Sequence, residues 1–275
     1  MSNCKVIALT NQKGGVGKTT TAGNLGVSLV QQGKKVLLID ADAQANLTMA
    51  LGYNRPDDIP ITLSTVMQNI IDDKTLDVSQ GIIHHSEGVD LLPSNIELSG
   101  FEVRLINAMS RERVLKTYVN EVKKNYDYVL IDCMPSLGMI TINALAAADS
   151  VIIPTQPHYL SAKGLELLLR SVSMVKRQIN PKLRIDGILM TMVMPRTNIS
   201  KEITATVKSA YGKKIKVFDT EIPHSIRAVE ATAEGKSIFA YDKSGKVAAA
   251  YEQLGKEVAE IGEKQRNQNR ADRIR

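Results

Sequence analysis

Several features are scarce or missing in this sequence. It contains no tryptophan, three phenylalanines and two cysteines, Cys4 and Cys133, which lie far apart. That spacing excludes a disulfide framework and a CxxC metal clip. No apolar run approaches the roughly 18 residues of a membrane span, and the glycine-rich stretch near the N-terminus follows at once after a short apolar run, without a charged-then-apolar leader. We therefore expect a cytoplasmic protein.

The remaining composition is that of a globular protein with an excess of positive charge. The chain has 275 residues, of which 43% are hydrophobic, so it can bury one substantial core, and one domain with additions is expected. The formal net charge is +6. A positive balance favours a polyanionic partner, and both nucleic acid and an anionic membrane surface have that character.

The stretch NQKGGVGKTT at 11–20 lies between an apolar run and a helical pattern that begins near Lys18. A strand that delivers glycines to a helix N-terminus directs several backbone N–H groups at one point, where the helix dipole also favours an anion. We expect Lys18 to reach the β- and γ-phosphates of a nucleotide and the Thr19 hydroxyl to bind Mg²⁺. The alternative is a glycine-rich turn with an incidental lysine. Three glycines would allow the close approach of a phosphate: Gly14, Gly15 and Gly17.

Two further apolar runs end in carboxylates. The run KVLLID is followed by DADAQAN at 40–46, and the run DYVLID ends at Asp132. Ligands of open α/β sheets bind at the carboxyl ends of the strands, where Asp40 and Asp42 can serve a Mg²⁺ shell and an attacking water. A strand that ends in an aspartate is the usual Walker B arrangement for holding Mg²⁺ through water. The alternative for Asp40 and Asp42 is a pair of solvated turn residues.

The phosphate loop departs from the common pattern GxxxxGKS/T, because Gln12 replaces the first glycine and Lys13 precedes the others. In this respect KGGVGKTT resembles the deviant phosphate loop of the ParA/MinD group of P-loop ATPases. The resemblance implies that Lys13 reaches the nucleotide of a second subunit, so that ATP is sandwiched in a homodimer; the alternative is a solvated loop lysine. The nucleotide contacts then expected are Lys13, Gly14, Gly15, Val16, Gly17, Lys18, Thr19 and Thr20.

The second motif is similar to the DxDPQGN segment of ParA relatives. The resemblance implies that Asp42 orients the hydrolytic water and that Asp40 supports Lys18 or the waters of Mg²⁺. Ala43 and Ala45 replace the usual proline and glycine, which leaves the rigidity of the loop and the rate of hydrolysis open. The segment MPSLGMITINALAAAD after Asp132 resembles the family's loop and helix that sense the γ-phosphate.

The C-terminal half carries the residues that the resemblance assigns to the base and to DNA. By comparison with relatives, the resemblance implies that Pro223 lies near the adenine. It also implies that Arg196, in an RTN motif, and Arg227 face DNA. Few aromatic residues are interleaved with the basic ones, and tryptophan is absent, which favours contact with the backbone of duplex DNA without sequence reading. The alternative is a solvated basic surface. Lysines that would support this binding are Lys201, Lys208, Lys213, Lys214 and Lys216.

The predicted fold is α/β, a mostly parallel sheet with helices on both faces, as in P-loop NTPases. We assign residues 1–262 to the ATPase domain, with Gly262 ending the last helix, and 263–275 to a basic disordered tail. A membrane-binding tail of the MinD type would need large apolar residues along one face. The tail offers only Ala271 and Ile274.

The predicted function is that of a ParA/Soj-type partition ATPase. It would use ATP and Mg²⁺ to dimerise, bind nonspecific double-stranded DNA on the nucleoid, and hydrolyse ATP slowly until a ParB-like centromere-binding protein stimulates it. The alternatives are a MinD-like membrane-associated positioning ATPase and an ATP-binding, DNA-associated regulator with little turnover. An iron–sulfur carrier is disfavoured by the two cysteines, and the adjacent His84 and His85 are read as surface residues rather than metal ligands.

Overall fold

The computed structural model describes residues 4–75 and 77–274. Its centre is a seven-stranded sheet of order β3-β4-β2-β5-β1-β6-β7, in which every neighbouring pair is parallel except β3 and β4. The strands are β1 (Lys5–Leu9), β2 (Val36–Ala41), β3 (Ile83–His84), β4 (Asp90–Leu92), β5 (Tyr128–Cys133), β6 (Ser150–Thr155) and β7 (Arg184–Met190).

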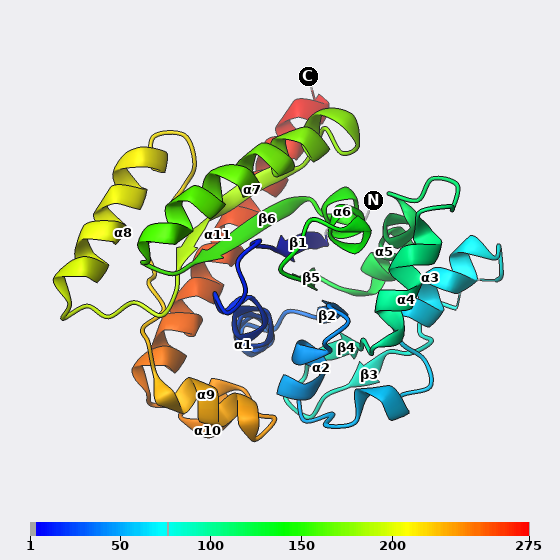
Figure 1. Cartoon of the computed structure of the whole chain (residues 1–275), viewed down its shortest axis with the longest axis horizontal. Helices are drawn as coiled ribbons and strands as arrows, with labels where there is room; N and C mark the ends of the chain where they lie inside the picture. Colours follow the sequence, from blue (N-terminus) through cyan, green and yellow to red (C-terminus); the bar gives the residue numbers. More distant parts are fainter. Residues whose placement is uncertain (1–3, 76, 275) are drawn as a thin grey trace.

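Helices cover both faces of this sheet (Figure 1). The face that contains α1 also carries α2, α9, α10 and α11, and the opposite face carries α3 to α8. The predicted fold class, a mostly parallel sheet with helices on both faces, is confirmed. The helix bounds are α1 (Lys18–Gln31), α2 (Asn46–Ala50), α3 (Leu63–Ile71), α4 (Glu97–Leu105), α5 (Val114–Val122), α6 (Met139–Ala147), α7 (Tyr159–Gln178), α8 (Asn198–Tyr211), α9 (Ile226–Ala233), α10 (Ile238–Tyr241) and α11 (Lys246–Ile274), with single 3-10 turns at Pro56–Asp58 and Lys123–Asn125.

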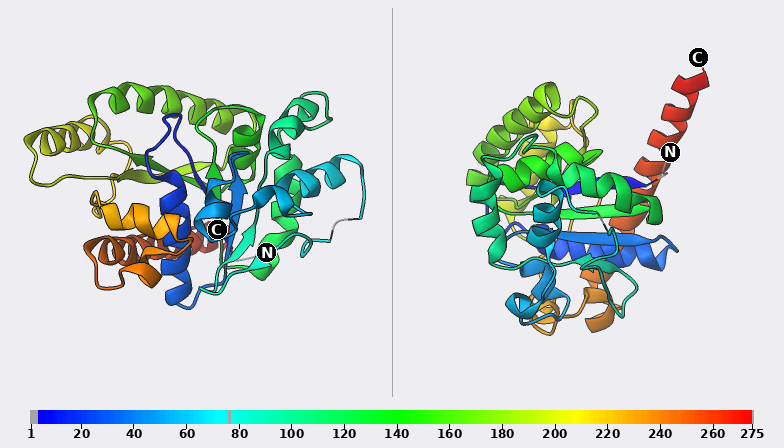
Figure 2. Two further views of the ribbon diagram at one scale, coloured as in Figure 1. Left: turned by 60° about the horizontal axis from the view of Figure 1, so that its bottom comes forward. Right: turned by 90° about the vertical axis from the view of Figure 1, so that its right-hand side faces the viewer.

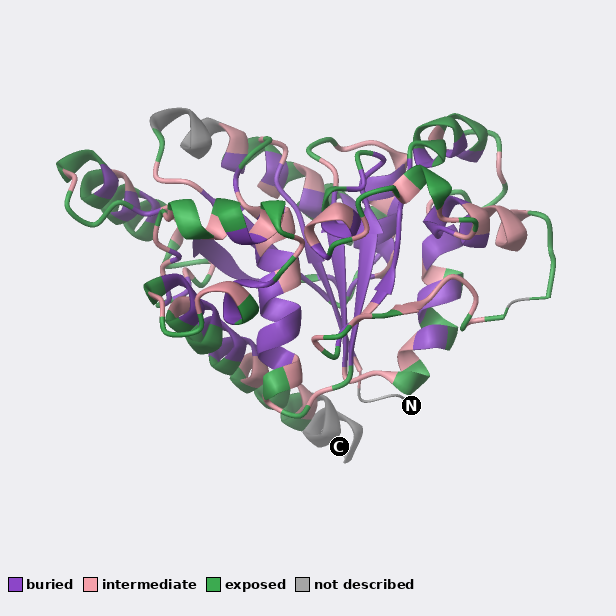
Figure 3. Cartoon of the chain, turned by 90° about the horizontal axis from the view of Figure 1, so that it is seen from below, coloured by how far each residue is buried: buried purple, intermediate pink, exposed green. Residues whose placement is uncertain are grey.

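The alternation of side chains along the strands divides the core in two. In β1, Val6 and Ala8 belong to the hydrophobic cluster on one face, and Ile7 and Leu9 to the cluster on the other. All four are at most 1% exposed, and Figure 3 shows the strands as a buried centre between helices that expose only part of their residues. Strands buried on both faces form a rigid support for the loops at their ends.

Parallel pairing brings the carboxyl ends of the central strands to one edge of the sheet. Leu9, the last residue of β1, is in register with Asp132 of β5, which is in turn in register with Asp40 of β2. The glycine-rich loop leaves β1 at this edge and enters α1 at Lys18. The phosphate loop and the carboxylates therefore share one edge, although Asp132 lies more than a hundred residues after the loop in the chain.

The last helix does not end at Gly262 as expected but continues to Ile274. The glycine serves close packing instead, because a Cβ at this position would lie 2.9 Å from the hydroxyl oxygen of Tyr128. Beyond it, Gln265 still contacts the sheet through a 2.9 Å hydrogen bond from Nε2 to Asp186 Oδ1. Figure 2 shows α11 beside α1, on the same face of the sheet. The division into a domain and a separate tail stays a prediction.

Residues 213–223, which follow α8, form no regular strand. Segment 213–223 pairs with the sheet only at isolated bridges, between Ile188 and Val217 and between Val193 and Pro223. Between the bridges, Thr220 N donates to Glu257 Oε1 at 2.9 Å, whereas Ile222 N donates to Met190 O of β7 at 2.9 Å. The segment is therefore an irregular edge that lies beside β7.

Candidate functional site

The glycines of the phosphate loop leave open space where a ligand can approach. Gly15 and Gly17 have φ angles of 69° and 80°, a left-handed backbone that favours glycine. A Cβ built on Gly14 or Gly15 would meet nothing within 4 Å. Gly17 is the N-cap of α1, so the first free N–H groups of that helix open onto the same space. This geometry fits an anion at the N-terminus of α1.

Lys18 lies at the inner side of this loop. Its side chain is largely buried, and its Nζ donates to the carbonyl oxygen of Lys13 at 3.3 Å. Burial lowers the pKa of the Lys18 ammonium, and the Asp132 charge opposes that shift. Because an ammonium has three N–H donors, Lys18 in this position can donate further hydrogen bonds to phosphate oxygens.

Asp132 is the carboxylate with the clearest need for a ligand. It is 1% exposed, and neither of its oxygens has a hydrogen-bond partner in the described part of the chain. Burial, and then the charge of Asp40, raise the pKa of Asp132 well above 3.8; the nearby Thr19 hydroxyl and Lys18 ammonium oppose this without forming a well-aligned hydrogen bond to it. Two orphaned carboxylate oxygens beside a hydroxyl fit Mg²⁺, a hard cation that binds oxygen.

The remaining ligands of such an ion would come from water and nucleotide. Among the described residues, no group of three or more histidines, cysteines, aspartates and glutamates could hold a metal. Mg²⁺ is commonly held by one or two carboxylates together with substrate phosphates, and Asp132 can supply one such carboxylate. His84 lies elsewhere and pairs with Asp90, with 2.5 Å between Nδ1 and Oδ1.

Asp40 is held by its own hydrogen bonds. It is completely buried, and its Oδ2 accepts from the backbone N and the Oγ1 of Thr48, at 2.9 and 2.7 Å. Burial nevertheless raises the pKa of Asp40 to about 6, against these hydrogen bonds. Its second oxygen accepts from the backbone N of Asp42 at 3.2 Å. Asp40 therefore shapes the start of the DADAQAN loop.

The two alanines of this loop do not leave it without support. Asp42 Oδ1 accepts from Gln44 N at 3.0 Å, and Ala45 N donates to Asp42 O at 2.9 Å. Ala43 and Ala45 are buried. Ala45 has a φ of 51°, the left-handed conformation that the usual glycine adopts more easily, so packing imposes it here. Asp42 itself is 8% exposed at the mouth of the loop.

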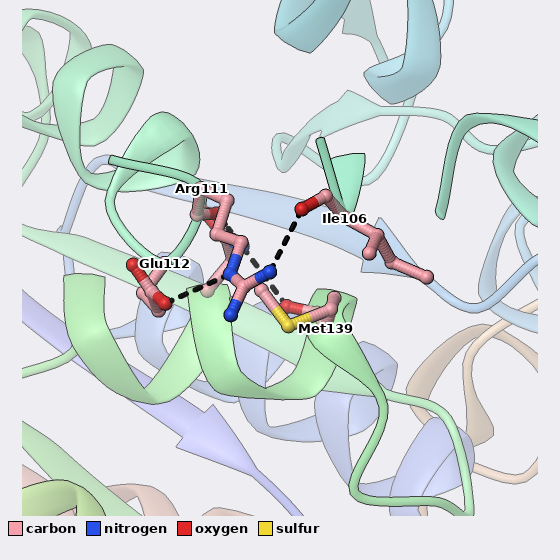
Figure 4. A network of polar contacts seen from close by, with 5 residues as sticks. Ile106, Arg111, Glu112 and Met139 are labelled. Atoms are coloured by element: carbon pink, nitrogen blue, oxygen red, sulfur yellow. Dashed lines mark hydrogen bonds and ion pairs between the residues drawn. The ribbon is translucent and has the colours of Figure 1, made fainter. Parts of the chain in front are cut away.

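The segment after Asp132 is anchored where α6 begins. Asn143 Nδ2 donates to the carbonyl oxygens of Met139 and Arg111, at 2.9 and 2.7 Å. Arg111 in turn donates to Ile106 O at 2.8 Å (Figure 4). The loop from β5 to α6 is therefore fixed at its far end by the connection between α4 and α5.

The structure brings together the two segments that carry the predicted DNA contacts. The bridge between Val193 and Pro223 joins them, and His224 N donates to Val193 O at 3.0 Å. Arg196 follows Val193 by three residues, and Arg227 follows Pro223 by four. Arg227 is exposed and forms an ion pair with Asp242, with 3.1 Å between Nη1 and Oδ1. Two of the expected supporting lysines, Lys208 and Lys216, form ion pairs with Glu221 and Glu257.

Sequence reasoning missed four residues that hold the site. Thr48 binds Asp40, and Gln156, Thr191 and Met192 contact the phosphate loop from the ends of β6 and β7. The polar residues at strand ends, TQ at 155–156 and T at 191, gave a signal, since ligands bind at that edge. No sequence pattern pointed to Thr48, because its contact with Asp40 depends on where α2 packs.

A glycine-rich loop leading from a buried parallel strand into a helix, with orphaned carboxylate oxygens in register beside it, defines a nucleotide-binding P-loop protein. Residues 4–185 match the family model described as an AAA domain. The sporulation initiation inhibitor protein Soj of Bacillus subtilis is 44% identical over 259 residues, which cover 94% of this chain and 99% of Soj. The chromosome partitioning protein ParA of Myxococcus xanthus is 39% identical over 256 residues, covering 92% of this chain and 87% of that protein.

A solved structure has a similar fold. Cobyrinic acid a,c-diamide synthase from Mycobacterium smegmatis, with bound ATP analog and magnesium, superposes with a TM-score of 0.81 at 35% identity, over 92% of this chain and 93% of that one. The chain therefore belongs to the family of P-loop ATPases that contains Soj and the ParA chromosome-partitioning proteins. The resemblance drawn from the sequence motifs is confirmed. No helix in the described ranges is long and apolar enough to cross a membrane.

The orphaned carboxylate makes a prediction for the ligand-free protein. Asp132→Asn removes a buried charge at nearly constant volume, and we expect it to raise the melting temperature at pH 8, in EDTA and without nucleotide, by roughly 3–8 °C. Because the folded-state pKa of Asp132 lies above 3.8, the wild type loses stability as pH rises above about 4, and the gain should shrink at pH 5.

The same variant should lose most of the thermal shift that Mg²⁺ with ADP gives the wild type. Asp58→Asn is the matched control, because its side chain is 71% exposed, and it should change neither quantity. A melting temperature lowered equally at both pH values would show that the Asp132 carboxylate is not an unpaired buried charge.

Proposed function

We propose that this protein is a DNA-partition ATPase that dimerises on ATP. The observation that carries the proposal is the deviant phosphate loop, in which Lys13 is partly exposed and Lys18 is buried. The chain that contains it aligns with nearly the whole of Soj. Two loops facing each other would place the Lys13 of each subunit at the nucleotide of the other. Closing two subunits in this way requires no further domain.

Within one subunit, the residues of the site would have the following roles. The N–H groups of the loop and the Lys18 ammonium hold the β- and γ-phosphates, and Thr19 and Asp132, supported by Asp40, hold Mg²⁺. That ion, when bound, neutralises charge that develops on the phosphates. Asp42, at the mouth of the loop, orients the attacking water. Other nucleotide contacts would be Gly14, Gly15, Val16, Gly17, Thr20 and, near the adenine, Pro223.

Dimerisation couples the nucleotide to DNA through electrostatics. Each subunit contributes Arg196 and Arg227 from two neighbouring segments, so a dimer doubles the number of phosphate contacts. The free energy of nonspecific binding grows with that number, because each neutralised phosphate releases counterions. Hydrolysis would separate the subunits and release the DNA. Bound to DNA in this way, the protein would be associated with the nucleoid.

Turnover by the protein alone should be slow. P-loop enzymes without a completed catalytic set work well below about one turnover per second, and a partner often completes the set. We propose that the partner is a ParB-like centromere-binding protein. The names of the relatives, chromosome partitioning protein ParA among them, support this choice of partner system.

Removing both arginines should weaken DNA binding without affecting nucleotide. We expect Arg196→Ala with Arg227→Ala to reduce ATP-dependent affinity for duplex DNA about tenfold or more, and to lower the slope of log K against log salt by about 0.9 for each lost phosphate contact. Fluorescence anisotropy at several salt concentrations measures both.

Arg55→Ala serves as the control, since that side chain is 86% exposed and lies outside the two segments. An unchanged affinity and salt slope in the double variant would place the DNA surface elsewhere on the molecule.

A further inference from the structure

Three side chains that follow β6 and β7 contact the phosphate loop at residues 15–17. Gln156 Nε2 donates to the carbonyl oxygen of Gly15 at 2.6 Å and also contacts Met192 Sδ. Thr191 Oγ1 donates to the carbonyl oxygen of Val16 at 2.8 Å, and this hydrogen bond is buried. Two successive loop carbonyls are thus held by donors from outside the loop.

Holding these carbonyls fixes where the neighbouring N–H groups point. In a planar trans peptide the C=O and the N–H point in opposite directions. With the Gly15 and Val16 carbonyls turned toward the ends of β6 and β7, the N–H groups of Val16 and Gly17 point the other way. A carbonyl turned toward the bound phosphates would repel them, whereas an N–H attracts them.

Met192 supports this arrangement at a cost in backbone strain. Its φ is 52°, which a residue other than glycine rarely adopts, and its Cε would lie 3.8 Å from a Cβ on Gly17. Strained residues persist where the surroundings determine their conformation, and they concentrate at ligand sites. Met192 here packs against the loop and also accepts the contact from Gln156.

We propose that Gln156, Thr191 and Met192 form a loop clamp that presets the peptide planes of residues 15–17 for the phosphates of a nucleoside di- or triphosphate. The inference rests on the proposed nucleotide site and adds Gln156 and Thr191 to it as positioning residues. Without the clamp the loop occupies its binding conformation for a smaller fraction of the time, and the apparent affinity falls by that fraction. The clamp acts on ground-state and transition-state binding alike, so turnover at saturation changes little.

The test measures Mg-ADP and Mg-ATP affinity by calorimetry, kcat at saturating ATP, and nucleotide-free melting temperature. Gln156→Ala and Thr191→Val should raise both dissociation constants about 5–30-fold while kcat stays within about threefold. Gln156→Glu, which places an acceptor against the Gly15 carbonyl, should raise them further. Thr191→Ser keeps the hydroxyl and should remain within about threefold of the wild type. Gln253→Ala, on the exposed side of α11, is the control.

Wild-type affinity in Gln156→Ala and Thr191→Val would overturn the clamp and leave the nucleotide site standing. Lowered affinity that Thr191→Ser fails to restore, or that follows a matching loss of melting temperature, would show a structural role only and would also overturn it. A wild type that does not bind Mg-ADP would instead refute the proposed function, so the two failures are distinguishable.

Discussion

Replacing Asp42 by alanine is expected to lower ATP turnover by about 100-fold or more, while ATP-dependent DNA binding persists. Positioned acids and bases contribute about 10²–10⁴-fold to such reactions. Asp42 is suited to orient water because it is nearly buried, at 8% exposure, and fixed by the hydrogen bond from Gln44 N. The phosphate contacts proposed for Lys18 and the loop do not involve Asp42. Phosphate release and retention on DNA, measured on the same sample, test this.

Asp58→Ala is the control for Asp42→Ala, because its exposed carboxylate lies outside the loop. Turnover of Asp42→Ala within a few-fold of wild type would remove Asp42 from the mechanism. Loss of ATP binding in that variant would instead assign Asp42 to the nucleotide site.

Replacing Lys13 by alanine is expected to prevent dimerisation while ATP still binds to the monomer. A charge-assisted contact is worth about 1.5–3 kcal/mol, and the dimer would lose two of them. The dimer dissociation constant should therefore rise about 100-fold or more. The backbone N of Lys13 donates to Asn11 Oδ1 at 3.0 Å, a contact that the substitution keeps, so the loop itself should persist. Analytical ultracentrifugation with Mg-ATP reads out the association state.

Lys34→Ala is the matched control, because Lys34 is partly exposed just before β2, at the opposite edge of the sheet. Dimerisation of Lys13→Ala at the wild-type concentration would contradict a contact across the dimer. DNA binding should fall together with dimerisation, since the monomer offers half of the phosphate contacts.

The fold and the centre of the site were predictable because local sequence determines them. Apolar runs that end in aspartates indicated buried strands, and parallel pairing then placed Asp40 and Asp132 in register beside the phosphate loop. The order of the strands could not follow from these runs alone. It was not predicted, because it depends on pairing between segments that are far apart in the chain.

What the sequence did not predict depends on contacts between distant segments. Gly262 resembles a helix stop, but the hydroxyl of Tyr128 leaves little room for a Cβ there, and α11 continues. Gln156 and Thr191 have no motif of their own, since their partners are loop carbonyls about 140 and 175 residues away in the chain. Because the last helix continues beyond Gly262, the case against a membrane-binding tail rests on its composition alone, with Ala271 and Ile274 as its apolar residues.

The measurement that tests the account most directly is binding to a duplex of arbitrary sequence, with ATP, ADP or no nucleotide, at low and moderate salt. The account predicts binding that requires ATP and weakens steeply with salt, because two subunits together neutralise the DNA phosphates. Equal binding in all three nucleotide states, or none in any, would contradict it. Binding to liposomes and to protein partners would then be tested next.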